Sequence, residues 1–191
     1  MIQTGIKLVN EGGLDKLSLR KIAAICNVSH SAPYSHFKNK ADLLSAMTQH
    51  VIQQFVNVLT EAIDKKNPSF EGLQRMGIAY VLYFLDNPLY FDFLFQRLKI
   101  KINFNSNDDS STYQPFLIYK EFMVNLLNQI NYPYELQLNV IISHWALVQG
   151  LASIAVLDTS ISSDEWRIKV PILLSGDHFL NHKNVPGDKS H

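Results

Sequence analysis

The chain has 191 residues, of which 47% are hydrophobic, and its 17 acidic side chains balance 17 basic ones. This length can bury a substantial core, and no run reaches the roughly 18 to 20 uninterrupted apolar residues of a membrane span. The single cysteine, Cys26, excludes an internal disulfide, and Met1 leads directly into an amphipathic pattern rather than a secretory signal. We therefore expect a soluble, cytoplasmic protein with no membrane partner.

The neutral net charge hides an uneven distribution. Residues 1–47 carry six basic and three acidic side chains, a net charge of +3, and the remainder carries 11 basic and 14 acidic ones. A basic head on a mildly acidic body is typical of a DNA-binding domain joined to another module. We predict a DNA-binding domain over 1–47, an effector-binding and dimerisation domain over 48–182, and a disordered tail over 183–191.

Three short helices are expected in the N-terminal domain. Apolar residues recur at helical spacing from Ile2, and Gly12 and Gly13 end that first helix. Ser18 can cap a second helix, and Asn27 interrupts its apolar pattern. A third helix then covers residues 29–36, where proline is acceptable only in the first turn.

The order of residues in this stretch resembles the helix-turn-helix of the tetracycline-repressor (TetR/AcrR) family of bacterial regulators. The matching positions include Leu17, Ser18, Leu19, Arg20, Ile22 and Ala23, followed by Val28, Ser29, Tyr34, His36, Phe37, Lys40, Leu43 and Leu44. The resemblance implies a homodimer that binds a palindromic double-stranded DNA operator. The motif lies close to Met1, so the resemblance assigns no contacts to an N-terminal arm.

The resemblance also implies which side chains face DNA. Five positions would face base edges: Ser29, His30, Ser31, Ala32 and Ser35. Five others would contact phosphates: Ser18, Arg20, Tyr34, His36 and Lys40. Tyr34 and His36 have an alternative role in packing and capping the domain. Pro33 stands where an apolar residue such as leucine is usual, and we expect it to shift the helix by part of a turn.

Helical patterns continue along the rest of the chain. One long helix is expected over 41–66, ended by Asn67 and Pro68, and another over 70–86. Asn87 and Pro88 predict a helix restart with asparagine as the cap, extending to Ile102. A polar loop over 103–114, expected to be mobile, precedes helices over 115–130 and 134–157.

A capping box of Ser162 and Glu165 begins the last helix, which Pro171 should bend or delay. The chain shows no convincing strand pattern. The predicted fold class is therefore all-α, with an N-terminal three-helix helix-turn-helix domain and a larger C-terminal helical ligand-binding and dimerisation domain.

The C-terminal half contains Trp145 and Gly150, which resemble the Trp-x-x-x-His-Gly element of one C-terminal domain type in the family, with Gln149 where histidine is usual. The family resemblance implies a cavity for a small apolar effector, although spacing alone fits a plain hydrophobic core. The expected lining residues are Tyr80, Phe84, Phe91, Phe95, Tyr119, Phe122, Trp145 and Gln149. Small and apolar residues of the last two helices are expected to form a four-helix dimer interface: Gly150, Ala152, Ser153, Trp166, Val170 and Leu173.

Catalytic and metal-binding patterns are weak. His178 and His182 have a spacing that can bind a metal, but next to a polar tail we interpret them as surface residues. No phosphate-binding glycine loop or nucleophilic triad is present as a local motif. We predict a non-enzymatic regulator, most simply a ligand-responsive repressor, without a cofactor or metal. The alternative is an all-α small-molecule-binding or interaction protein that has lost specific DNA binding.

Overall fold

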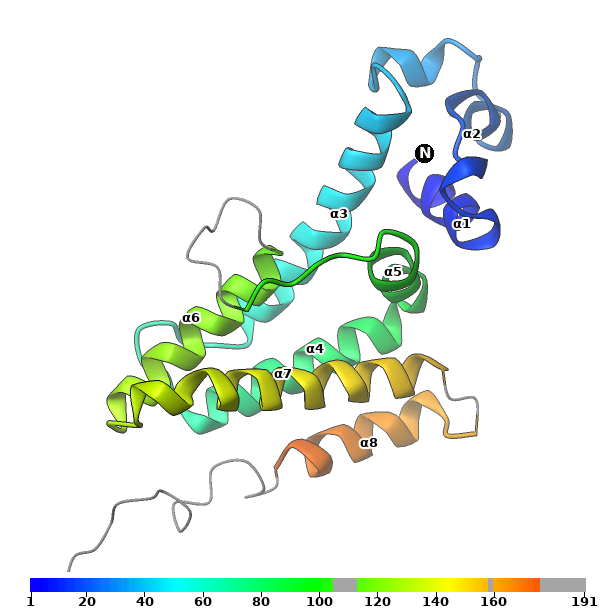
Figure 1. The fold of residues 1–191 in the computed structure, drawn as a ribbon. Coiled ribbons are helices and arrows are strands. Elements are labelled where there is room, and N and C mark those ends of the chain that lie inside the picture. The colour runs from blue at the N-terminus through cyan, green and yellow to red at the C-terminus, as the bar shows by residue number, and fades with distance from the viewer. Residues whose placement is uncertain (105–112, 158–159, 176–191) are drawn as a thin grey trace, which may run out of the picture.

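The computed structural model describes residues 1–104, 113–157 and 160–175, and all their regular elements are helical. The predicted all-α fold class is confirmed. The N-terminal unit sits at one end of the molecule, and one long helix, α3, connects it to the larger unit (Figure 1). The elements in chain order are α1 Ile2–Gly12, η1 Leu14–Lys16, α2 Leu19–Ile25, η2 Ala32–Ser35, α3 Lys40–Glu61, α4 Phe70–Asp86, α5 Pro88–Phe91, η3 Asp92–Arg97, α6 Gln114–Gln129, α7 Tyr134–Leu157 and α8 Ser163–Leu174.

The N-terminal unit packs α1 and α2 against the start of α3. Ile6, Ile22 and Met47 are fully buried between these helices. Gly5 allows the close approach of α1 and α3, because a Cβ atom there would lie 2.7 Å from the sulfur of Met47. The predicted cap of α2 is present, since the Ser18 hydroxyl accepts a hydrogen bond from the Lys21 amide.

Helix α3 begins in the N-terminal unit and ends in the larger one. The Asn39 side chain caps it by accepting a 2.9 Å hydrogen bond from the Asp42 amide. The helix ends at Glu61, earlier than the predicted 66. Asp64 explains the difference, because its carboxylate accepts hydrogen bonds from the Lys66 amide at 2.9 Å and from the Asn67 side chain at 2.8 Å. A side chain that binds its own backbone in this way competes with helix formation.

The larger unit contains α4, α6, α7 and α8, and α4 packs most extensively against α7 (Figure 1). The capping box predicted at Ser162 and Glu165 is present at the start of α8. Helix α8 remains continuous through Pro171. The predicted domain boundary at residue 47 stays a prediction, because one hydrophobic core runs from α1 to α8.

The segment after α4 differs from the predicted single helix. Pro88 begins α5 as expected, but α5 ends at Phe91 and continues as a π-helical turn to Arg97. The Asn87 side chain does not cap α5. Its side-chain amide instead donates a 2.8 Å hydrogen bond to the Tyr83 carbonyl. Lys99 then adopts a positive φ of 51°, which ends the helical path well before Ile102. Most of the predicted polar loop and the whole predicted tail lie outside the described residues.

Helix α7 is long and apolar enough to cross a membrane by length and composition alone, although core helices of soluble proteins pass the same test. One of its faces is buried in this structure, with Ile141, Trp145 and Val148 in the core. Its exposed face includes Ile142, Ile154 and Leu157. Burial in the core accounts for the apolar residues on one face of α7. It does not account for the apolar residues on the exposed face.

Candidate nucleic-acid interface and ligand cavity

The turn of the helix-turn-helix is formed at Asn27. This residue has a φ of 54°, in the left-handed region that asparagine tolerates better than most residues. The Val28 amide then donates a 3.0 Å hydrogen bond back to the Ala23 carbonyl, which closes the end of α2. The chain therefore leaves α2 sharply and presents the following residues at the surface.

The third helix is shorter and tighter than predicted. The residues 29–36 were expected to form one helix, but the structure forms only a 3₁₀ helix over Ala32–Ser35. The physical reason is Pro33, which has no N–H group and so cannot make the α-helical bond to the Ser29 carbonyl. That carbonyl instead accepts a 3.0 Å bond from the Ala32 amide.

The side chains predicted to face DNA lie on an exposed surface. Tyr34 has 51% of its surface exposed, which favours a surface role over its alternative role in packing. Ala32 is half-buried, and the other predicted DNA-binding residues are all exposed: Ser18, Arg20, Ser29, His30, Ser31, Tyr34, Ser35, His36 and Lys40. The structure thus gathers small, hydrogen-bonding and basic side chains around the turn of the N-terminal unit.

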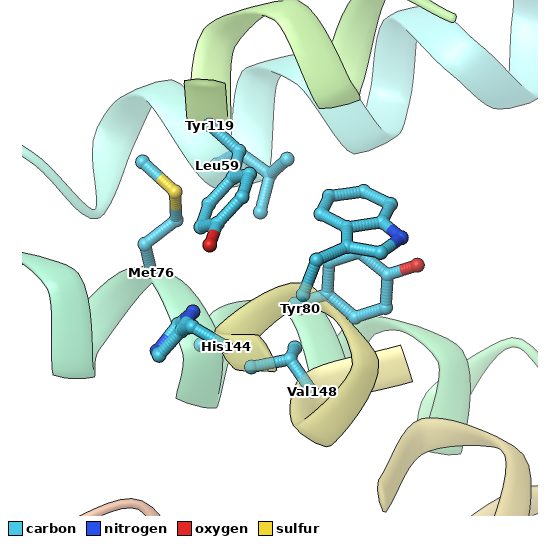
Figure 2. A pocket seen from close by; sticks show the side chains of 8 residues that line it. Leu59, Met76, Tyr80, Tyr119, His144 and Val148 are labelled. Atoms are coloured by element: carbon cyan, nitrogen blue, oxygen red, sulfur yellow. The ribbon is translucent and has the colours of Figure 1, made fainter. Parts of the chain in front are cut away.

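A small cavity of about 10 Å³, room for about one water molecule, lies between α3, α4, α6 and α7. Figure 2 shows side chains from these helices converging on it. Eight residues line it: Leu59, Met76, Gly77, Tyr80, Tyr119, His144, Trp145 and Val148. The lining is mostly aromatic and aliphatic, which suits an apolar occupant.

The polar groups of the cavity are engaged by the protein itself. The Tyr119 hydroxyl donates a 2.8 Å hydrogen bond to the Ile141 carbonyl, and the Tyr80 hydroxyl donates to the side-chain oxygen of Gln149. Burial raises the pKa of both tyrosines. The His144 ring stacks on Tyr119 with 5.6 Å between ring centroids. Burial also lowers the pKa of His144 from 6.5 to about 4, so the imidazole is neutral at pH 7.

The family model that describes the tetR family of bacterial regulatory proteins matches residues 1–47. Residues 1–47 form a TetR-family domain. This domain contains the exposed side chains around the turn and the 3₁₀ helix. The matched family is one of bacterial regulatory proteins, as the resemblance implied.

Curated relatives match part of the chain. An uncharacterized helix-turn-helix transcriptional regulator from Haemophilus influenzae is 35% identical over 83 residues, which cover 43% of this chain and 44% of the relative. The class G tetracycline repressor protein of Vibrio anguillarum is 39% identical over 54 residues, 28% of this chain and 26% of the repressor. The chain thus matches less than half the length of these relatives.

Solved structures share the fold over almost the whole chain. The transcriptional regulator FadR from Bacillus subtilis, in complex with stearoyl-CoA, aligns with a TM-score of 0.66 and 15% identity over 91% of this chain and 95% of that one. A TetR-family transcriptional regulator from Haemophilus influenzae aligns with a TM-score of 0.61 and 21% identity over 90% and 92%. The chain therefore combines the TetR-family domain with a TetR-like helical C-terminal unit.

The structure brings together only part of the predicted ligand site. Three of the predicted residues line the cavity: Tyr80, Tyr119 and Trp145. Gln149 does not line it, but its side-chain oxygen accepts a hydrogen bond from the Tyr80 hydroxyl. Phe84, Phe91 and Phe95 instead pack on one another in a neighbouring aromatic cluster, and the Phe122 ring packs close to Gly72. Five lining residues were not predicted from the sequence: Leu59, Met76, Gly77, His144 and Val148. Only His144 carried a signal, as a polar residue beside Trp145 on an apolar helix.

The structure also divides the predicted dimer residues. Ala152, Trp166 and Val170 are buried in the core of the protomer and cannot supply surface to a partner. Leu173 is exposed, and Gly150 and Ser153 are half-buried. The exposed faces of α7 and α8 carry other large apolar side chains: Ile142, Ile154 and Leu157 on α7, and Ile168 and Ile172 on α8.

Among the described residues, no group of three or more histidine, cysteine, aspartate or glutamate side chains could hold a metal. His178 and His182 lie outside the described residues.

Proposed function

We propose that this protein is a ligand-responsive transcription repressor of the cytoplasm that binds a palindromic operator as a homodimer. The observation that carries the proposal is the exposed turn and 3₁₀ helix of the TetR-family domain. The net charge of +3 over residues 1–47 supports it, because phosphate neutralisation supplies much of the affinity for DNA.

The residues predicted to face DNA divide by chemistry into two roles. Lys40 and Arg20 are cations on either side of the turn, suited to phosphates, as are Ser18, Tyr34 and His36. Ser29, His30, Ser31, Ala32 and Ser35 are small or hydrogen-bonding residues that a major groove can accept. Phosphate contacts would hold the register, and contacts to base edges would select the sequence.

A second copy of the chain would cover the exposed apolar faces of α7 and α8. Helix α7 has small side chains, Ala146, Gly150 and Ser153, between Ile142 and Leu157 on one face, which allows close approach of a partner helix. Two such pairs of helices would form a four-helix interface. The two recognition segments would then lie about 34 to 36 Å apart, to enter successive major grooves.

The cavity beside Tyr80 and His144 is the proposed effector site. The fold supports this assignment, because FadR carries stearoyl-CoA and a TetR variant from Acinetobacter baumannii carries minocycline. The likeness of Trp145 and Gly150 to the Trp-x-x-x-His-Gly type also supports it, with Gln149 in place of the histidine. An occupant larger than one water requires the side chains to move, which would displace α3 and alter the DNA-binding geometry. A coupling of about 1 to 3 kcal/mol would weaken operator affinity 5- to 150-fold.

A genomic selection tests the proposal. The purified protein is incubated with sheared DNA of its own organism at moderate salt, and the retained fragments are sequenced. We expect enrichment of a palindrome. The double variant Tyr34→Ala and Lys40→Ala should lose that enrichment while it retains the helical content and oligomeric state of the wild type. A folded dimer that enriches nothing would instead favour a ligand-binding or interaction protein without specific DNA binding.

A further inference from the structure

We propose that Pro33 sets the DNA sequence preference of this protein, because it holds the recognition segment in a 3₁₀ helix and thereby fixes which side chains face the bases. The inference rests on the proposed function as a DNA-binding regulator. Pro33 is a positioning residue in it: the proline ring is buried, and its exposed neighbours would make the contacts, Ser31 to a base edge and Tyr34 to a phosphate.

The hydrogen bonds show where the tightening arises. The Ser29 carbonyl accepts from the Ala32 amide at 3.0 Å, and the Ser31 carbonyl accepts from the Tyr34 amide at 3.0 Å. Both bonds span three residues, the 3₁₀ pattern, rather than the four of an α-helix. The spacing of four first returns where the Phe37 amide donates to the Pro33 carbonyl at 2.8 Å.

One property of proline keeps the segment in this form. Its missing N–H group removes the α-helical bond to the Ser29 carbonyl. Burial of the ring anchors it in the N-terminal unit. The constraint is therefore covalent and does not depend on DNA.

The geometry of a 3₁₀ helix changes what the groove meets. Each residue advances by about 120° and 2.0 Å, compared with about 100° and 1.5 Å in an α-helix. Side chains three apart are eclipsed, so Ser31 and Tyr34 lie on one ridge, and Ala32 and Ser35 on the next. In an α-helix, Tyr34 would be rotated by about 60° relative to Ser31. With Tyr34 held at a phosphate, such a rotation would change the direction in which Ser31 faces the groove.

A side-chain hydrogen bond also links residues three apart in this segment. The Ser35 hydroxyl donates a 2.7 Å hydrogen bond to the carbonyl of Ala32, which precedes it on the same ridge. Its proton is therefore directed to the backbone, and its oxygen can only accept from a base.

The test compares the wild type with Pro33→Ala and Pro33→Leu by selection from randomised duplex DNA. Pro33→Leu keeps apolar volume in the buried site, in case Pro33→Ala is poorly folded. Pro68→Ala is the matched control, a buried proline in the loop before α4. We expect the wild type and Pro68→Ala to select one palindrome. The Pro33 variants should select half-sites in which at least one preferred base changes, by about tenfold or more in relative affinity, with unchanged half-site spacing.

Two further outcomes separate the inference from the proposed function. If all four proteins select the same sequence with the same preferences, Pro33 has no positioning role, although DNA binding stands. If the wild type selects no sequence, the proposed function fails, and the inference fails with it. Nuclear Overhauser measurements on the free wild type give a check that needs no DNA. Contacts between residues four apart in the sequence, within 29–36, would overturn the 3₁₀ assignment.

Discussion

The side-chain amide of Asn10 donates a 2.8 Å hydrogen bond to the backbone carbonyl of Leu89, and so joins α1 of the N-terminal unit to α5 of the larger one. The Arg97 guanidinium donates a hydrogen bond to the backbone carbonyl of Asn10. The same guanidinium forms an ion pair with Asp92, with 3.1 Å between Nε and the carboxylate oxygen. A single segment, α5 with η3, thus provides polar contacts across the two units. It is also the segment that the sequence predicted least well.

Asn10→Ala should destabilise this junction. Asn10 is only 8% exposed, and loss of its amide leaves the Leu89 carbonyl without this donor, which costs about 1 to 3 kcal/mol. Urea unfolding measures the change in the free energy of unfolding. The matched control is Gln53→Ala, which removes an exposed 2.9 Å bond to Asn57 and should change stability by less than about 0.5 kcal/mol. Equal effects of the two substitutions would contradict a structural role for the junction.

Ile154→Glu should convert the proposed dimer into a monomer. Ile154 is 55% exposed on α7 beside half-buried Ser153, and a charge there would have to be buried against its symmetric copy in a dimer. Sedimentation equilibrium measures the association. Tyr134→Glu, at the exposed first residue of α7, is the control and should leave the dimer intact. A dimer that survives Ile154→Glu would place the interface elsewhere.

His144 should make the fold sensitive to acid. Its pKa is about 4 in the folded protein and 6.5 ordinarily, so the unfolded chain binds the proton more readily. The contribution to stability is complete above pH 6.5 and is lost as pH falls from 6.5 through about 4. The loss amounts to about 3 kcal/mol.

Urea unfolding at pH 7.5 and pH 4.5 checks the role of His144. The His144→Gln variant should lose less stability between these two values than the wild type does. His30→Gln, which replaces an exposed histidine, should follow the wild type. A His144→Gln variant with the same pH dependence as the wild type would show that this imidazole is accessible to protons in the folded state.

Local sequence signals were sufficient to predict α7 and the start of α8. Ser162 with Glu165 marked the start of α8, and the periodic apolar residues of α7 gave its full range. The end of α3 was missed because Asp64 binds its own backbone, a local alternative that an apolar period does not reveal. The interruption of α5 by a π-helical turn was missed for a related reason, since its stripe of aromatic residues continues regardless of the backbone path.

Side-chain partners were less predictable than helices. Trp166 and Val170 have the spacing of an interface stripe, but that stripe packs into the protomer core. Only the three-dimensional packing distinguishes the two faces of α8, because both are apolar. The cavity likewise combines residues from four helices, and Leu59 and Met76 carry no signal that separates them from other core positions. Pro33 was predicted to shift the recognition helix by part of a turn, and that shift stays a prediction, because the structure shows a short 3₁₀ helix over Ala32–Ser35.

Lys40→Ala should weaken DNA binding in a way that depends on salt. Lys40 is exposed at the first residue of α3, next to the recognition segment. If it neutralises one phosphate, its loss should reduce the slope of log K against log salt by about 0.9. Affinity should fall by a similar factor for operator and random DNA, because a phosphate contact carries no sequence information.

Lys66→Ala provides the matched control for the Lys40 measurement. It removes the same charge just beyond the opposite end of α3, from an exposed lysine. Because that end lies far from the N-terminal unit (Figure 1), screening at physiological salt should remove its influence on DNA. Fluorescence anisotropy over a salt titration measures both slopes. Equal slopes for the two variants would show that Lys40 contributes only to the overall charge, and the phosphate contact would then have to be assigned to another of the exposed residues around the turn.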